Sequence, residues 1–174
     1  WELAQENRAL NVKKVLVRRE APSLGKAAVQ DVEAILRDTE IDTVVEVLGG
    51  LHPAYEWICR ALAAGKDVVT ANKAVISAYY RELTALAREN GVALRCTAAV
   101  GGGIPWLVNL QRCRRVDTVT EVGGIMNGTT NFIMDAMARQ GADFPAVLQR
   151  AQELGYAEAD PSADIDGDDI RRKL

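Results

Sequence analysis

Histidine, cysteine and aromatic residues are all scarce in this chain of 174 residues, which contains one histidine, three cysteines and 5% aromatic residues. The cysteines, Cys59, Cys96 and Cys113, are odd in number and lack the paired C-x-x-C spacing of zinc and redox sites. This pattern argues against a disulfide framework, and we expect buried, reduced thiols.

Long apolar runs and a broad basic surface are also lacking. No apolar stretch approaches the roughly 20 residues that cross a bilayer, and the first residues show no signal-peptide pattern. The formal net charge is -3, and the arginines are not interleaved with aromatic residues. We therefore expect a cytoplasmic protein that acts on small molecules, with no nucleic-acid partner and no membrane partner.

An alternation of strands and helices fills the first hundred residues. Strands rich in valine and leucine are expected at 11–19, 43–48, 67–70 and 92–97, with helices at about 29–37, 54–64 and 78–88. Strands separated by helices form crossover units and a parallel sheet that is covered on both faces. The fold class predicted for this part is α/β.

The pattern changes after Gly101-Gly102-Gly103. We expect a helix at 104–112, a longer strand at 118–126 and two helices near 130–139 and 144–154. The apolar faces of these helices need a second sheet or a partner to cover them. A domain boundary is therefore placed near this glycine run, giving domains at 1–103 and 104–174.

Ligands of open parallel sheets bind at the carboxyl ends of the strands. Gly49-Gly50 follows the strand at 43–48, and glycine lets a cofactor approach the backbone closely, although a simple turn is an alternative. Lys73 follows the strand at 67–70 and precedes apolar residues. The alternative is an ordinary exposed surface lysine. A partly buried lysine is costly unless it meets an anion or a polar substrate, so we favour a functional lysine that meets one of these.

Three further segments stand out. The Gly101–Gly103 run can hold an anion or a cation, or act as a hinge. Residues 127–131 have a turn signature and a threonine cap. Six carboxylates between 158 and 169 usually form a solvated loop, and the glycine lies too early after Asp164 for a calcium loop. Asp169 and Lys173 are four residues apart and would share one face of a helix.

Several of these segments resemble homoserine dehydrogenase, the NAD(P)-dependent enzyme that interconverts L-homoserine and L-aspartate 4-semialdehyde in threonine, methionine and isoleucine biosynthesis. The motifs are EVLGGLHPA, GKDVVTANKAVI, AVGGGIP, GIMNGTTNFIM and GYAEADPSADIDGDD with the trailing Lys173. The resemblance implies a partial Rossmann-type NAD(P)-binding domain at 1–103. It also implies part of a second, α+β domain at 104–174 for substrate binding and homodimerisation.

The resemblance also implies roles for individual residues. Lys73 would lie between nicotinamide and substrate, and Gly49-Gly50 along the cofactor. Glu158 would bind the amino group of homoserine, and Asp169 and Lys173 would lie at its reacting end. The residue types fit this chemistry, because reduction of an aldehyde creates an alkoxide that needs a cationic proton donor nearby. Lys173 and Lys73 would meet that need, and Asp169 would orient the lysine.

Two features of the resemblance concern bound ions and cofactor choice. A monovalent cation, usually sodium, would bind the carbonyls of Val100, Gly102 and Ile104, although Thr97 replaces a glutamate that assists in many members. Arg18 and Arg19 end the strand after which such domains recognise the ribose, and arginine can pair with the 2′-phosphate of NADP. We therefore favour NADP over NAD.

The resemblance further implies a glycine-rich turn before Trp1 and more of the second domain after Leu174, so we expect the isolated chain to be inactive. Fusion to an aspartate kinase stays open. One alternative, an aldehyde dehydrogenase of the semialdehyde type, needs a cysteine nucleophile paired with a histidine, and no such pair is evident. Another, a non-catalytic oligomeric module, is disfavoured because Lys73, Glu158, Asp169 and Lys173 occur together.

Overall fold

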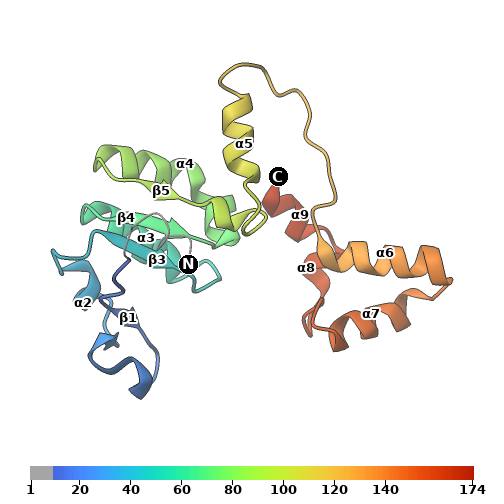
Figure 1. The fold of residues 1–174 in the computed structure, drawn as a ribbon, viewed down its shortest axis with the longest axis horizontal. Coiled ribbons are helices and arrows are strands. Elements are labelled where there is room, and N and C mark those ends of the chain that lie inside the picture. The colour runs from blue at the N-terminus through green and yellow to red at the C-terminus, as the bar shows by residue number, and fades with distance from the viewer. Residues whose placement is uncertain (1–9) are drawn as a thin grey trace. The chain divides into compact units, whose positions relative to one another are not determined.

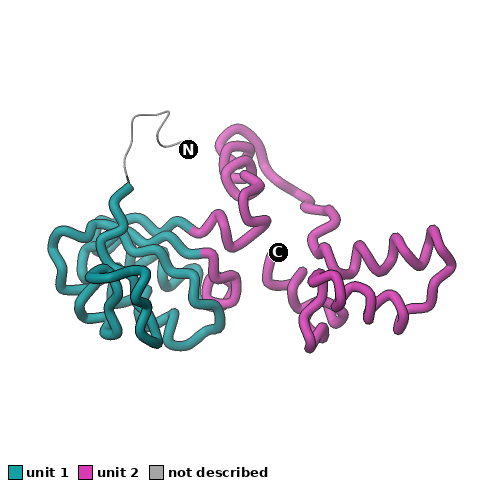
Figure 2. Tube along the Cα trace, turned by 60° about the horizontal axis from the view of Figure 1, so that its bottom comes forward, with its two compact units in different colours: residues 1–70, 79–95 teal, residues 71–78, 96–174 magenta. Residues whose placement is uncertain are grey.

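The structure is a computed structural model that describes residues 10–174. Its contacts divide the chain into two compact units (Figure 2). The first unit consists of the described residues up to Thr70 together with Tyr79–Arg95, and the second of Ala71–Ala78 together with Cys96–Leu174. Within residues 10–174, no helix combines the length and the apolar character needed to cross a membrane.

The first unit contains two small parallel sheets (Figure 1). One has the strand order β3 (Thr43–Glu46), β4 (Asp67–Thr70), β5 (Leu94–Arg95), and the other pairs β1 (Val15–Leu16) with β2 (Ala28–Val29). Every pairing is parallel, with a helix between consecutive strands of the larger sheet. The predicted α/β class with a parallel sheet is thereby confirmed.

Helix α3 (Ala54–Ala63) packs on β3 and β4 through one apolar face. Its residues Ala54, Ile58, Ala61 and Leu62 are buried, and their spacing of three and four positions is that of a helix face. Burial of one Ile or Leu side chain contributes about 1.5–3 kcal/mol, so this face is a main attachment of the helix to the sheet.

Helix α4 (Lys73–Glu89) contributes residues to both units. Its first residues belong to the second unit, and the part from Tyr79 onward belongs to the first. Tyr79 has non-helical backbone angles, φ -128° and ψ 15°, so the helix is kinked where the division falls. The later part is held in the first unit by the buried side chains of Leu83 and Ala87.

Two predictions for the first unit need correction. The helix expected at 29–37 is reduced to α2 (Glu33–Leu36), preceded by the 3-10 segment η1 (Pro22–Ala27) and by β2. Val29 is extended because it pairs with β1 and accepts a hydrogen bond from the Val17 amide at 2.8 Å. The strand expected at 11–19 is reduced in the described residues to β1, which covers Val15–Leu16.

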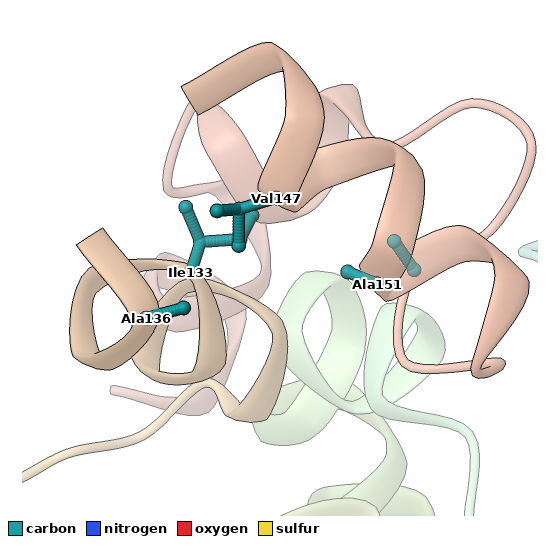
Figure 3. Packing of buried hydrophobic residues seen from close by; sticks show 5 residues of the cluster. Ile133, Ala136, Val147 and Ala151 are labelled. Atoms are coloured by element: carbon teal, nitrogen blue, oxygen red, sulfur yellow. The ribbon is translucent and has the colours of Figure 1, made fainter. Parts of the chain in front are cut away.

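The regular elements described in the second unit beyond Cys96 are helices. After the 3-10 turn η2 (Thr97–Ala99), its helices are α5 (Trp106–Cys113), α6 (Gly128–Gln140), α7 (Phe144–Glu153), α8 (Ser162–Ile165) and α9 (Asp168–Lys173). Helices α6 and α7 form a hairpin whose core is shown in Figure 3. Ile133 and Ala136 of α6 pack against Val147 and Ala151 of α7, and Ala157 completes this cluster.

The strand predicted at 118–126 is wrong for this structure. The segment between α5 and α6 has no strand partner among residues 10–174, and its side chains include Val116 at 88% and Ile125 at 82% exposure. An alternating sequence favours extended backbone, but a strand forms only where another strand accepts its hydrogen bonds. The sheet expected in the α+β domain is therefore not seen in the described residues.

Candidate active site

The carboxyl ends of β3 and β4 are joined by a buried carboxylate. Glu46, only 5% exposed, accepts a hydrogen bond from the Leu48 amide at 2.7 Å and one from the Thr70 hydroxyl at 2.6 Å. Leu48 leads into the glycine turn after β3, and Thr70 is the last residue of β4. Glu46 therefore fixes both strand ends at the edge where ligands of parallel sheets bind.

The turn that follows β3 is open to a ligand. Gly49 and Gly50 have φ of 75° and 71°, which side chains rarely tolerate. A Cβ built on either glycine would meet no atom within 4 Å, so the protein leaves this space open. Without a side chain at either position, a bound molecule can approach the backbone closely. Arg19 is exposed in a bend that follows β1.

In the second unit, Lys73 is the first residue of α4. The Asn72 side chain accepts a hydrogen bond from the Val75 amide at 3.3 Å and so caps the helix. Lys73 donates to Asp169 of α9, and its side chain is 38% exposed. The contact joins residues 96 positions apart in sequence, which no local pattern reports.

Asp169 is the centre of this cluster. It is 4% exposed and accepts hydrogen bonds from Lys73, from the Lys173 ammonium at 2.6 Å and from the Asn127 amide at 2.8 Å. Lys173 also donates to the Met126 carbonyl at 2.6 Å. Two lysines therefore converge on one carboxylate in a partly buried position, which is an arrangement expected near a reacting oxygen.

Opposing influences set the pKa of Asp169. Burial alone raises the pKa of its carboxyl, but the hydrogen bonds from Lys173, Lys73 and Asn127 outweigh burial and lower the pKa to about 2. The group is therefore an anion at neutral pH. A fixed anion in this position holds both lysine side chains in place through charged hydrogen bonds.

Two members of the cluster were not predicted as site residues. Asn127 accepts from the Thr130 amide at 2.8 Å and donates to Asp164 at 2.7 Å as well as to Asp169. The cap of α6 is thus Asn127, and the threonine cap expected in this turn is wrong. The sequence did contain a signal for Asn127 as the cap, because asparagine is among the preferred N-cap residues. Asp164 was missed because acidic runs are usually solvated loops.

The loop that carries Glu158 is anchored to α6 by its neighbours. The Thr129 hydroxyl donates to the Tyr156 carbonyl at 2.7 Å, and the Tyr156 ring stacks on Phe132 at 4.9 Å. Gln152 donates to the Glu158 carbonyl at 3.1 Å. Glu158 is exposed. Among the described residues, the hydrogen-bond partners of Asp169 are Lys73, Asn127 and Lys173, and Glu158 is not one of them.

The glycine run before α5 forms a tight turn. Gly101 and Gly102 have positive φ, the Ile104 amide donates to the Gly101 carbonyl at 3.0 Å, and the Ile104 carbonyl accepts from the Trp106 amide at 2.8 Å. Val100 precedes the turn, and Thr97 begins η2. Among residues 10–174, no three His, Cys, Asp or Glu side chains gather as metal ligands.

The cysteines do not supply an activated nucleophile. All three are free, but only Cys59 and Cys96 are partly buried, while Cys113 is exposed, so the expectation of burial is wrong for Cys113. Burial is the main cause that raises the pKa of the Cys59 and Cys96 thiols, which disfavours the reactive thiolate. His52 is exposed, and its Nδ1 atom is hydrogen-bonded to Oε1 of Glu56 at 2.6 Å. These contacts argue against an aldehyde dehydrogenase that uses a Cys–His pair.

A parallel α/β unit whose glycine turn follows a strand is a feature of dinucleotide-binding domains, which bind their cofactor at the carboxyl ends of the strands. Family models agree with this class. Residues 2–97 match "Homoserine dehydrogenase, NAD binding domain", and residues 105–174 match "Homoserine dehydrogenase". The chain belongs to the homoserine dehydrogenase family.

Curated relatives carry the same name. The homoserine dehydrogenase of Synechocystis is 46% identical over 172 residues, with 96% of this chain and 40% of the relative covered. That of Bacillus subtilis is 40% identical over 170 residues, with 95% and 39% covered. The chain thus spans about two fifths of the length of these relatives.

Solved structures give the same result. The homoserine dehydrogenase of Thiobacillus denitrificans matches with a TM-score of 0.91 and 41% identity, over 99% of this chain and 42% of that one. A hyperthermophilic archaeal homoserine dehydrogenase in complex with NADPH matches with a TM-score of 0.78 and 30% identity, over 87% and 47%.

Proposed function

We propose that these residues are part of a longer protein that interconverts L-homoserine and L-aspartate 4-semialdehyde with a nicotinamide cofactor. The observation that carries the proposal is the contact of Lys73 and Lys173 with the buried Asp169. Such an enzyme would serve the synthesis of threonine, methionine and isoleucine.

Lys173 and Lys73 are assigned to the reacting oxygen. When bound, the nicotinamide cofactor accepts hydride from homoserine or donates it to the semialdehyde. In the direction of reduction, an ammonium group stabilises the growing negative charge on oxygen and then donates a proton to it. In the direction of oxidation, one lysine in its neutral amine form accepts the hydroxyl proton and becomes an ammonium group. Asp169 contacts the substrate and keeps both lysines oriented.

Glu158 is assigned to the amino group of the substrate. Its carboxylate is exposed, and its loop is anchored by Thr129, Phe132 and Gln152. An exposed anion on a fixed loop can accept hydrogen bonds from a substrate ammonium group. This contact would select an amino acid over a simple alcohol of the same length.

The cofactor is proposed to bind along Gly49 and Gly50, with contacts from Lys73 and Arg19. NADP is favoured over NAD, because an exposed arginine after β1 can pair with the 2′-phosphate. The domain that binds it is proposed to end at residue 103, with 104–174 forming part of the substrate and dimer domain. The complete protein is proposed to be a cytoplasmic homodimer.

A sodium ion is proposed at the carbonyls of Val100, Gly102 and Ile104. The Ile104 carbonyl already accepts one hydrogen bond, which leaves its second lone pair for a cation. Thr97 offers a hydroxyl in place of a carboxylate, so binding should be weak. A melting temperature of the complete protein that is the same in sodium chloride and in choline chloride would contradict this site.

The proposed activity is tested by oxidation of L-homoserine with NADP and with NAD. The complete protein should reduce both cofactors, NADP more efficiently, and the 174-residue chain alone should give no turnover. A complete, folded protein that reduces neither cofactor would remove the proposal, and a non-catalytic module of this fold would replace it. Full turnover by the 174-residue chain would contradict the expectation that it is an inactive piece.

A further inference from the structure

We propose that Asn127 is a positioning residue that fixes Asp169, and through it both lysines, by joining Asp169 to the N-terminus of α6. The inference deepens the proposed function and rests on it. In this proposal the turn before α6 starts the helix and also positions the charged groups of the reaction.

Both ends of the Asn127 amide are used. Its oxygen accepts from the Thr130 amide at 2.8 Å and the Thr130 hydroxyl at 3.0 Å, while its nitrogen donates to Asp164 at 2.7 Å and Asp169 at 2.8 Å. Asn127 is 5% exposed, so water does not compete freely for these bonds. The backbone amide of Thr130 requires an acceptor, which rules out the flipped amide.

The position of Asn127 needs one acceptor for the start of α6 and one donor for each carboxylate. An asparagine NH₂ has two protons, and here one is directed to Asp164 of α8 and the other to Asp169 of α9. Serine has one donor and a shorter reach, and an ionised aspartate would add a third negative charge. Asparagine is thus the side chain that can cap α6 and hold both acids at once.

Met126, the residue before Asn127, binds Lys173, the cation of the Lys173–Asp169 ion pair. Lys173 donates to the Met126 carbonyl at 2.6 Å and to Asp169 at 2.6 Å. Consecutive residues, Met126 and Asn127, therefore bind the lysine and the acid of one helical turn of α9. The cap that fixes Asn127 also fixes this short segment, so the geometry of the pair depends on the start of α6.

The charged groups that face Asp169 decide its protonation. They are Lys73 of α4 and Lys173 of α9, with Asp164 of α8 held beside it through Asn127. The Asn127 hydrogen bond favours the anion, so its loss should raise the pKa of Asp169. A merely structural cap would not produce this change.

The test uses the complete protein with Asn127→Ser, which can still cap α6 but cannot bridge the acids. Thr130→Val is the matched control, since it removes one hydrogen bond to the same amide oxygen and leaves the bridge intact. We expect Asn127→Ser to lower kcat for homoserine oxidation by about 10- to 100-fold, as for loss of a hydrogen bond to a charged group, with KM for the cofactor little changed. The acidic limb of its pH profile should move to higher pH.

Thr130→Val should keep kcat within about threefold of wild type, as expected for a substitution without a part in the reaction. If Asn127→Ser instead loses stability but retains kcat per folded molecule and an unshifted pH profile, the inference is overturned and Asn127 is a cap only. Acid-dependent unfolding measures the same contact without substrate, and it should begin at higher pH in Asn127→Ser. An inactive wild type would therefore end the proposed function, while the unfolding comparison would still decide the role of Asn127.

Discussion

Lys173 and Asp169 lie one turn apart in α9, with the ammonium 2.6 Å from the carboxylate. The carboxylate is buried and also binds Lys73, so removing its charge should affect both lysines. This relationship links the stability of the second unit to the chemistry proposed for it.

Asp169→Asn removes the charge and keeps the shape of the side chain. Both lysines lose their shared anion, so we expect a fall in kcat/KM of about 100-fold and a loss of stability of about 3–5 kcal/mol. Homoserine oxidation and urea unfolding of the complete protein measure the two effects. Asp168→Asn is the control, because the Asp168 side chain is 45% exposed and pairs with Arg171. Equal effects of the two substitutions would contradict the central place of Asp169.

Acid should weaken the fold through Asp169. Its pKa is lowered from 3.8 to about 2 by hydrogen bonds that outweigh burial, so its contribution is present above pH ~4 and is lost as pH falls toward ~2. The shift corresponds to a contribution on the order of 2 kcal/mol. The difference in unfolding free energy between wild type and Asp169→Asn should therefore shrink between pH 5 and pH 2. A constant difference across this window would show that Asp169 is not the titrating group.

Glu46→Ala should destabilise the first unit. The Thr70 hydroxyl and the Leu48 amide each lose the buried carboxylate to which they donate a hydrogen bond, which costs about 1–3 kcal/mol. The affinity for NADP should fall too, since the glycine turn after β3 is no longer fixed. Urea unfolding and cofactor titration measure both. Glu20→Ala, at an exposed position, should change stability by less than about 0.5 kcal/mol.

Arg19→Ala should reduce the preference for NADP. Loss of a charged hydrogen-bond donor to the 2′-phosphate costs about 1.5–3 kcal/mol, so kcat/KM with NADP should fall about 10- to 100-fold while that with NAD changes little. Arg37→Ala is the control, because Arg37 is an exposed arginine paired with Glu33. A parallel fall with both cofactors would assign Arg19 to the fold and remove it from cofactor choice.

The sequence predicted elements that have strong local signals. Helices were expected at 54–64 and 144–154 and lie at Ala54–Ala63 and Phe144–Glu153, and the strand at 67–70 is reproduced as β4. Apolar periodicity and flanking Pro or Gly residues specify such elements within one window. The strand at 118–126 was wrong because pairing depends on a partner elsewhere, which periodicity does not report.

The candidate site shows the same limit. Asp169 and Lys173 could be grouped from their spacing, because a helix brings residues four apart together. The bridge from Asn127 to Asp169 spans 42 positions and joins the start of one helix to another, so it has no local signature. Motif resemblance indicated Lys73 and Glu158, but only the structure could report that Lys73 contacts Asp169 and that Glu158 lies outside this cluster.

The most direct test of the account is L-homoserine oxidation by the complete protein with Lys173→Ala, compared with wild type and with Arg171→Ala. Arg171 is an exposed cation of the same helix that pairs with Asp168. We predict that Lys173→Ala lowers kcat at least ~100-fold, the range for losing an acid–base group, while Arg171→Ala stays near wild type. Wild-type turnover from a folded Lys173→Ala protein would contradict the assignment of Lys173 to the reacting oxygen.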